Sequence, residues 1–165
     1  MIHVYTGEGK GKTTASIGLG IRAIGANKKV LMVQFLKDGK SSEKEVIEEV
    51  DGFDVKSFGR TGVLKPGDFS NEDKKLVGLG FDFLEENAEK YDLIILDEIN
   101  VAIHMNLIDV DKIISFLKRN SNKEIVLTGR NAKKEIIEIA DLVTDLKEVK
   151  HYFRSGTPAR KGIEF

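Results

Sequence analysis

The chain has 165 residues, 41% of them hydrophobic and 32% charged, and these values are typical of one globular domain spanning residues 1–165. Its formal net charge of −1 gives no general electrostatic attraction to nucleic acid or to an anionic membrane, so we expect neither as a partner. The absence of cysteine excludes disulfides, a thiolate nucleophile and cysteine-ligated metal sites.

The first residues lack the pattern of a secretory signal, and no apolar run approaches the roughly 18 residues that a membrane-spanning helix needs. The sequence therefore predicts a cytoplasmic protein.

Short apolar runs alternate with helical patterns along the chain, which predicts βαβ units. Several runs consist only of Ile, Val and Leu, as is typical of strands buried on both faces of a parallel sheet. We expect an α/β fold with one mostly parallel sheet flanked by helices and with ligands at the carboxyl ends of its strands. The expected strands are residues 2–6, 30–36, 53–58, 93–96, 125–127 and 142–149.

A glycine-rich stretch follows the first expected strand and precedes a helical pattern over residues 15–26. This order of elements is typical of a polyphosphate cradle, in which backbone N–H groups and a helix N-terminus face the phosphates. The motif G-x-x-x-x-G-K-S/T is matched only in its second half, because Thr6 replaces the first glycine. The alternative is a flexible turn with no ligand. The stretch comprises Thr6, Gly7, Glu8, Gly9, Lys10, Gly11, Lys12, Thr13 and Thr14.

Within this stretch, Lys12 is expected to reach phosphate oxygens, and the hydroxyl of Thr13 is expected to hold Mg²⁺. Two further loops, residues 37–42 and 59–69, leave the carboxyl ends of the second and third strands. Loops at this edge of a sheet often carry function. The alternative is that both are plain surface connectors.

Helices are expected between the later strands. Ser70 or Asn71 can cap one, Asp109 can cap a second, and a third covers residues 132–140.

The fourth expected strand, residues 93–96, ends in two carboxylates, Asp97 and Glu98. In P-loop proteins an acid at this place binds Mg²⁺ directly or through water. The acid pair alone is a weak signal, since it could be a solvated pair or a helix cap. Together with Lys12 and Thr13, about 85 residues earlier, it predicts a Mg–nucleotide site in a RecA-like P-loop NTPase fold.

The residue types also limit the chemistry. No nucleophilic triad can be assembled without cysteine and with three histidines, His3, His104 and His151, each expected to be packed or on the surface. From the residues alone, the prediction is a protein that binds Mg–nucleotide in a cleft covered by two loops.

Several blocks of the sequence, in order, resemble the P-loop type of corrinoid (cob(I)alamin or cob(I)yrinic acid a,c-diamide) adenosyltransferases. The set extends from residue 4 to the last residue and includes Thr6 before the glycines. The blocks are residues 4–14, Arg22-Ala23-Ile24-Gly25, Val33-Gln34-Phe35-Leu36-Lys37, Leu96-Asp97-Glu98-Ile99-Asn100, Leu127-Thr128-Gly129-Arg130, Ala140-Asp141-Leu142-Val143-Thr144, Val149-Lys150-His151 and Gly162-Ile163-Glu164-Phe165.

The resemblance implies a reaction in which Co(I) of a reduced corrinoid attacks C5′ of ATP, giving adenosylcorrinoid and triphosphate in adenosylcobalamin synthesis or salvage. Co(I) is itself a strong nucleophile, so the protein needs no activated side chain. It must supply a site for the leaving triphosphate, and preorganised charge at such a site is a large catalytic effect. The family is thought to bind ATP reversed relative to other P-loop NTPases.

Site residues follow from the resemblance. The stretch of residues 6–14 is expected to bind ATP, with Arg22 and Arg130 as further contacts. The alternative for Arg22 is an exposed helix residue with no ligand. Thr13, Asp97 and Glu98 are expected to hold Mg²⁺ (or Mn²⁺), and Lys12, Thr13 and Glu98 to be the catalytic groups. Gln34, Phe35, Lys37, Val63, Leu64 and Phe69 are expected to contact the corrinoid, with the nucleotide as the alternative contact for Gln34, Phe35 and Lys37.

Two alternatives remain open. One is a RecA-like ATPase or kinase in which Glu98 positions a nucleophile for γ-phosphoryl transfer. The other is a non-catalytic, ATP-dependent corrinoid carrier. The resemblance also implies a homodimer and a flavin-type reductant as partners.

Overall fold

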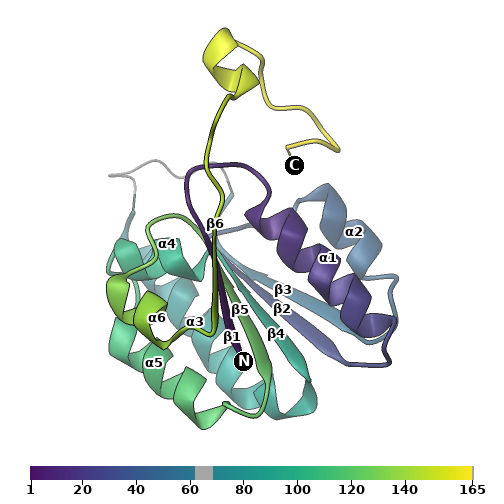
Figure 1. Cartoon of the computed structure of the whole chain (residues 1–165), viewed down its shortest axis with the longest axis vertical. Coiled ribbons are helices and arrows are strands. Elements are labelled where there is room, and N and C mark those ends of the chain that lie inside the picture. Colours follow the sequence, from purple (N-terminus) through teal and green to yellow (C-terminus); the bar gives the residue numbers. More distant parts are fainter. Residues whose placement is uncertain (62–68, 165) are drawn as a thin grey trace.

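The computed structural model describes residues 1–61 and 69–164. Within these ranges the chain forms one sheet of six strands in the order β3-β2-β4-β5-β1-β6, and every neighbouring pair is parallel (Figure 1). This arrangement confirms the predicted α/β fold. The strands are β1 (Ile2–Thr6), β2 (Val30–Phe35), β3 (Phe53–Phe58), β4 (Leu93–Asp97), β5 (Glu124–Thr128) and β6 (Leu142–Asp145).

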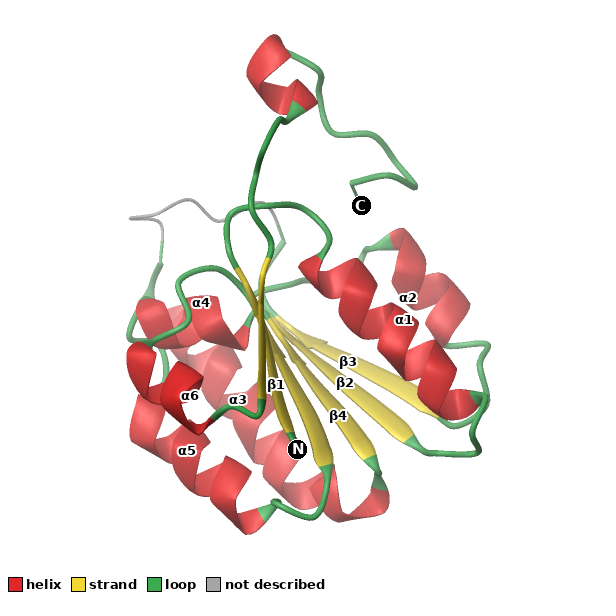
Figure 2. Cartoon of the chain, viewed as in Figure 1, coloured by secondary structure: helices red, strands yellow, loops and turns green. Residues whose placement is uncertain are grey.

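Helices cover both faces of the sheet, with α1 and α2 on one side and α3 to α6 on the other (Figure 2). The central strands contribute side chains to the two hydrophobic cores, one on each face of the sheet. In β2, Leu31, Val33 and Phe35 pack on the α3 side, whereas Val30 and Met32 pack on the α1 side. The helices are α1 (Lys12–Ile24), α2 (Ser42–Ile47), α3 (Asn71–Asn87), α4 (Ile99–His104), α5 (Val110–Arg119) and α6 (Lys134–Ile139), with 3₁₀ turns at Ala88–Lys90 and Tyr152–Ser155.

The two predicted caps are present. Ser70 precedes α3 and forms a capping box with Asp73, in which each side chain bonds to the other's backbone N–H. Asp109 precedes α5 and accepts a hydrogen bond of 3.0 Å from the N–H of Asp111. None of the described helices combines the length and apolar character required to cross a lipid bilayer.

The last strand, β6, is shorter than predicted and ends at Asp145. Its neighbour β1 ends at Thr6 and becomes the glycine-rich loop, so residues beyond 145 have no strand to pair with. They follow the loop instead: Leu146 N–H donates to Thr6 O at 2.9 Å, and Gly9 N–H donates to Leu146 O at 2.6 Å. The approach is so close that a Cβ at Gly7 would lie 2.5 Å from Leu146 O. Glycine at position 7 is therefore required by packing as well as by its positive φ of 96°.

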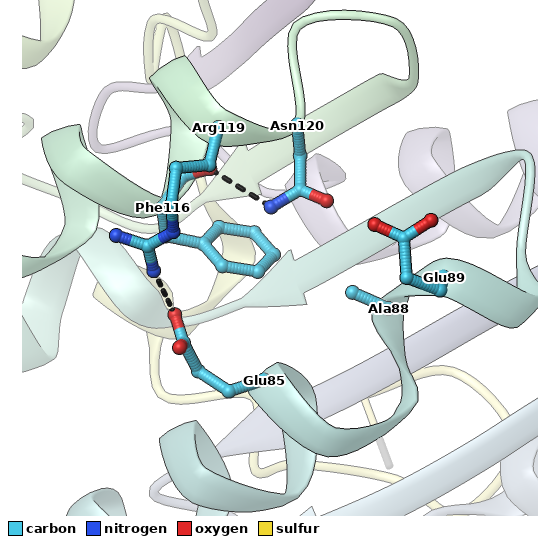
Figure 3. Close-up of a pocket in the computed structure, with 6 residues that line it drawn as sticks. All are labelled: Glu85, Ala88, Glu89, Phe116, Arg119 and Asn120. Atoms are coloured by element: carbon cyan, nitrogen blue, oxygen red, sulfur yellow. Dashed lines mark hydrogen bonds and ion pairs between the residues drawn. The ribbon is translucent and has the colours of Figure 1, made fainter.

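A shallow pocket of about 420 Å³ lies between the last turns of α3 and α5 (Figure 3). These turns lead into the starts of β4 and β5, so the pocket is at the edge of the sheet opposite the strand carboxyl ends. Its polar groups bond to one another: Arg119 pairs with Glu85, and the Asn120 amide donates to Phe116 O. The lining residues are Glu85, Ala88, Glu89, Phe116, Arg119 and Asn120.

Candidate functional site

The glycine-rich loop connects β1 to α1, and α1 begins directly at Lys12. Gly11 immediately before it has φ 114°, a left-handed conformation that glycine adopts without steric cost. The Lys12 ammonium lies inside the loop, with Nζ 2.7 Å from both Gly7 O and Gly9 O. Burial lowers the pKa of this lysine. The loop, the N–H groups of the first turn of α1 and Lys12 together present the kind of groups that could hold a polyphosphate.

The acid at the end of β4 lies beside this loop, with β5 between β4 and β1. Asp97 is fully buried, and its Oδ1 accepts hydrogen bonds from the hydroxyls of Thr13 at 2.9 Å and Thr128 at 2.7 Å. The start of α1 and the ends of β4 and β5 therefore meet at one carboxylate. Thr13 and Asp97 were predicted to share a site, and the structure brings them together.

Thr128 was missed as a functional residue, although it lies in one of the blocks that carried the resemblance. Its hydroxyl donates to Asp97 and also accepts from the backbone N–H of Glu98 at 3.0 Å. The parallel register of β4 and β5 accounts for this position of Thr128. It pairs Leu96 with Leu127, so the residues that follow them, Asp97 and Thr128, lie side by side.

Glu98 follows Asp97 in a left-handed conformation, with φ 61°. A non-glycine residue in this conformation is strained, and such strain is common at functional sites. The carboxylate of Glu98 lies close to the backbone of Gly129, because a Cβ added to Gly129 would be 3.3 Å from Glu98 Oε2. Burial and the charge of Asp97 raise the pKa of Glu98. The turn at Glu98 thus brings a second acid to the same strand end.

The donor set fits the metal that was predicted. The hydroxyl of Thr13 and the carboxylates of Asp97 and Glu98 offer hard oxygen ligands of the kind that Mg²⁺ prefers. Among the described residues, no group of three or more Asp, Glu, His or Cys side chains is placed to coordinate a metal ion by itself. This matches Mg²⁺ sites in which one or two carboxylates share the ion with water and substrate phosphates.

Lys37 was expected to face the corrinoid or the nucleotide, and its ammonium points at the acid pair. Its Nζ lies 2.6 Å from Asp97 Oδ2 and 3.3 Å from Thr13 Oγ1. Burial alone would lower the pKa of Lys37, but the charge of Asp97 and the hydrogen bond to it outweigh burial and raise the pKa.

The other predicted residues divide into two groups, of which the first lies at the loop. Arg130 forms an ion pair of 3.1 Å with Glu8. Lys10 points the other way, toward the C-terminal segment, where its Nζ contacts Tyr152 OH at 3.1 Å, Ile163 O at 2.6 Å and Glu164 Oε1 at 2.8 Å. Figure 1 shows this segment turning back toward the start of α1.

The second group does not reach the loop. Arg22 is exposed in the last turn of α1, roughly 15 Å along the helix from Lys12. Phe35 is fully buried in the core on the α3 side, so it supports the sheet and is not open to a ligand in this structure. Phe69 is half-buried against the same core. Val63 and Leu64 lie outside the described residues.

Two buried amides remain incompletely bonded near the acid pair. Gln34 pairs with Asp97 in the strand register, and its Oε1 accepts from Ser57 Oγ at 2.8 Å, but its Nε2 has no hydrogen-bond partner among the described residues. Asn100 in α4 donates to Leu127 O at 3.5 Å and leaves its Oδ1 without a partner among them.

The parallel sheet, the glycine loop closed by Lys12 and the hydrogen bond between Thr13 and Asp97 define the class: an α/β domain of the P-loop NTPase type. The whole chain, residues 1–165, matches the family described as ATP:corrinoid adenosyltransferase BtuR/CobO/CobP. The chain belongs to this family, which confirms the resemblance seen in its sequence blocks.

Three relatives illustrate the similarity, and each carries the name corrinoid adenosyltransferase. The protein from Sinorhizobium sp. is 38% identical over 172 residues, which cover 100% of this chain and 80% of that protein. The Pseudomonas aeruginosa protein is 33% identical over 170 residues, covering 98% and 82% of the two chains. The Escherichia coli K12 protein is 29% identical over 174 residues, covering 100% and 85%.

Proposed function

We propose that this protein transfers the 5′-deoxyadenosyl group of ATP to Co(I) of a reduced corrinoid. The electron pair of Co(I) forms the bond to C5′, the C5′–O bond breaks, and its electrons leave with inorganic triphosphate. The observation that carries the proposal is the position of Lys12 inside the loop at the head of α1. It provides fixed positive charge for a triphosphate leaving group, which is where negative charge develops in this reaction.

The family and the site support one role for each group. Lys12 and the N–H groups of residues 7–14 bind the triphosphate, with Arg130 beside them at Glu8. Thr13 and Glu98 would hold Mg²⁺, or Mn²⁺ in its place, with Asp97 fixing the hydroxyl of Thr13. A bound divalent ion would neutralise part of the triphosphate charge. The side chains themselves hold, orient and neutralise ATP, and none is required to act as a nucleophile.

The corrinoid is proposed to bind over the carboxyl ends of β2 and β3. Phe69, two residues before α3, lies at this edge. Val63 and Leu64 stay proposed contacts from the sequence and lie outside the described residues. Lys37 and Gln34 approach the same edge from β2, although both are committed to contacts with Asp97 or Ser57 in this structure. Arg22, far from the loop in one subunit, is left without a proposed contact.

The assembly and location are also proposals. A homodimer is supported by the exposed edge strand β6, where Leu142 and Val143 are 42% and 43% exposed. A flavin-type reductant is proposed because the corrinoid must be reduced to Co(I) before the attack. A cytoplasmic location is proposed because ATP, the co-substrate, is a cytoplasmic nucleotide.

The test is a product analysis under anaerobic conditions with ATP, Mg²⁺ and chemically reduced cob(I)alamin. The proposal predicts loss of the Co(I) absorption together with release of triphosphate. A RecA-like ATPase or kinase would release ADP and transfer or release the γ-phosphate. A corrinoid carrier would bind the corrin without the spectral change of alkylation.

A further inference from the structure

Lys37 occupies the position at which a divalent ion would be expected. Its ammonium lies 2.6 Å from Asp97 Oδ2 and 3.3 Å from the Thr13 hydroxyl, so it bridges two of the three predicted metal-binding groups. A positive charge between a hydroxyl and a carboxylate is what a magnesium ion supplies at such a site.

The backbone is shaped to hold Lys37 there. Leu36, directly after β2, has φ 60°, a left-handed conformation that a leucine rarely adopts. Its N–H donates to Phe58 O at 2.9 Å, and the chain then turns away from the path of the strand. Gly59 packs so closely on this turn that a Cβ would lie 2.3 Å from Lys37 N. Two unusual backbone features therefore direct this one side chain to the acids.

The acids need a positive partner. Asp97 is fully buried, and Glu98 beside it adds a second carboxylate. The nearest lysine of the loop, Lys12, is engaged with the carbonyls of Gly7 and Gly9. Among the described residues, Lys37 is the one cation that forms an ion pair with Asp97. A buried carboxylate without a positive partner is strongly unfavourable, so the ion pair with Lys37 stabilises the charged form of Asp97 in the absence of a metal ion.

We propose that Lys37 is a built-in counter-ion that fills the metal position in the nucleotide-free protein and is displaced when metal and nucleotide bind together. The released ammonium then pairs with the triphosphate, which remains negative after one divalent ion has bound. Lys37 is thus a positioning residue that suppresses binding of metal alone and favours binding of the metal–nucleotide complex. The inference rests on the proposed function only in assigning a divalent ion to Thr13 and Glu98, beside Asp97.

The first test measures Mn²⁺ binding to the nucleotide-free protein by electron paramagnetic resonance, with Lys37→Met compared with the wild type. Removal of the ammonium is expected to tighten Mn²⁺ binding by about tenfold or more, because the ion no longer competes with a resident charge. Lys37→Arg keeps the charge and is expected to bind Mn²⁺ as weakly as the wild type. Lys40→Met removes an exposed lysine of the same loop and is the matched control. Equal Mn²⁺ affinity in Lys37→Met and wild type would overturn the inference.

The second test needs only the wild-type protein and covers the case in which Lys37→Met does not fold. Crystals grown with Mg²⁺ and a non-reactive ATP analogue are expected to show the Lys37–Asp97 contact broken, and metal-free crystals to show it intact. A contact that persists beside a bound metal ion contradicts the inference. Neither test contains a corrinoid, so each stands independently of the product analysis. Release of ADP in that analysis would refute the proposed function and leave the counter-ion role in place.

Discussion

Thr13 and Asp97 are 84 residues apart in the sequence, and the hydroxyl of Thr13 donates a hydrogen bond of 2.9 Å to Asp97 Oδ1. This bond ties the first turn of α1 to the end of β4, two elements that are separated in the sheet by β5. It fixes the orientation of the threonine oxygen that is proposed to bind a divalent ion. The glycine-rich loop before α1 and the acid pair after β4 are therefore one structural unit.

Lys12→Ala is expected to lower turnover by about tenfold or more, because fixed positive charge at a leaving group is among the larger catalytic effects. The fold is expected to survive, since Lys12 Nζ bonds only to loop carbonyls. Steady-state kinetics and a thermal melt measure the two effects. Lys28→Ala, an exposed lysine beyond α1, is the control. A near-normal rate in Lys12→Ala would refute its assignment.

Thr128→Val is expected to destabilise the protein by about 1–3 kcal/mol, because it leaves the N–H of Glu98 and one side of Asp97 without their partner in a buried site. Thr128→Ser keeps the hydroxyl and is expected to lose much less stability than Thr128→Val. Urea unfolding of both variants provides the measurement. A loss of stability in Thr128→Val no larger than that in Thr128→Ser would contradict this assignment to the hydroxyl.

Gly9→Ala is expected to weaken ATP binding and lower stability, since the added Cβ would lie 2.7 Å from Leu146 O and push the loop away from the segment after β6. Gly18→Ala, in the same region of the chain but on the exposed face of α1 with open space around it, is the contrasting variant. It is expected to stabilise the protein by about 0.4–1 kcal/mol by restricting the unfolded chain. Titration calorimetry with ATP measures the effect of each variant on ATP binding, and a thermal melt measures its effect on stability. Equal behaviour of both alanines would show that the loop does not depend on this close packing.

The pH dependence of stability is expected to include a contribution from Asp73, which completes the capping box of α3 with Ser70. Burial alone would raise its pKa, but hydrogen bonds from Arg60 and Ser70 outweigh burial and lower it below the ordinary value of 3.8. A lowered carboxyl pKa adds stability that is present above pH 3.8 and is lost as the pH falls through the folded-state pKa. Asp73→Asn is expected to flatten the unfolding free energy in this acidic window. If the unfolding free energy of Asp73→Asn falls with decreasing pH as steeply as that of the wild type, Asp73 does not contribute to this pH dependence.

Much of the framework was predictable because its signals are local. Short apolar runs, several of them continuous, identified all six strands, and the glycine-rich loop before α1 was located from residues 6–14. The caps at Ser70 and Asp109 were found from residue type and spacing. The short helices α2 and α4 were not predicted, since six residues give too little periodicity to detect.

What could not be predicted depends on tertiary geometry. The direction of Lys37 is set by a positive φ at Leu36 and by the approach of Gly59, and neither appears as a sequence pattern. Phe35 was taken for a ligand contact, but the alternation of side chains along β2 directs it into the core. The role of Thr128 arises from the register between two strands that are distant in the sequence.

The most direct test of the central claim uses ATP carrying ¹⁸O at the bridge between C5′ and the α-phosphorus, incubated with cob(I)alamin and Mg²⁺. Attack of cobalt on carbon is predicted to leave the label in triphosphate, with one triphosphate formed for each adenosylcorrinoid. Recovery of the label in ADP or AMP, with orthophosphate released, would show that phosphorus is the site of attack and would contradict the account.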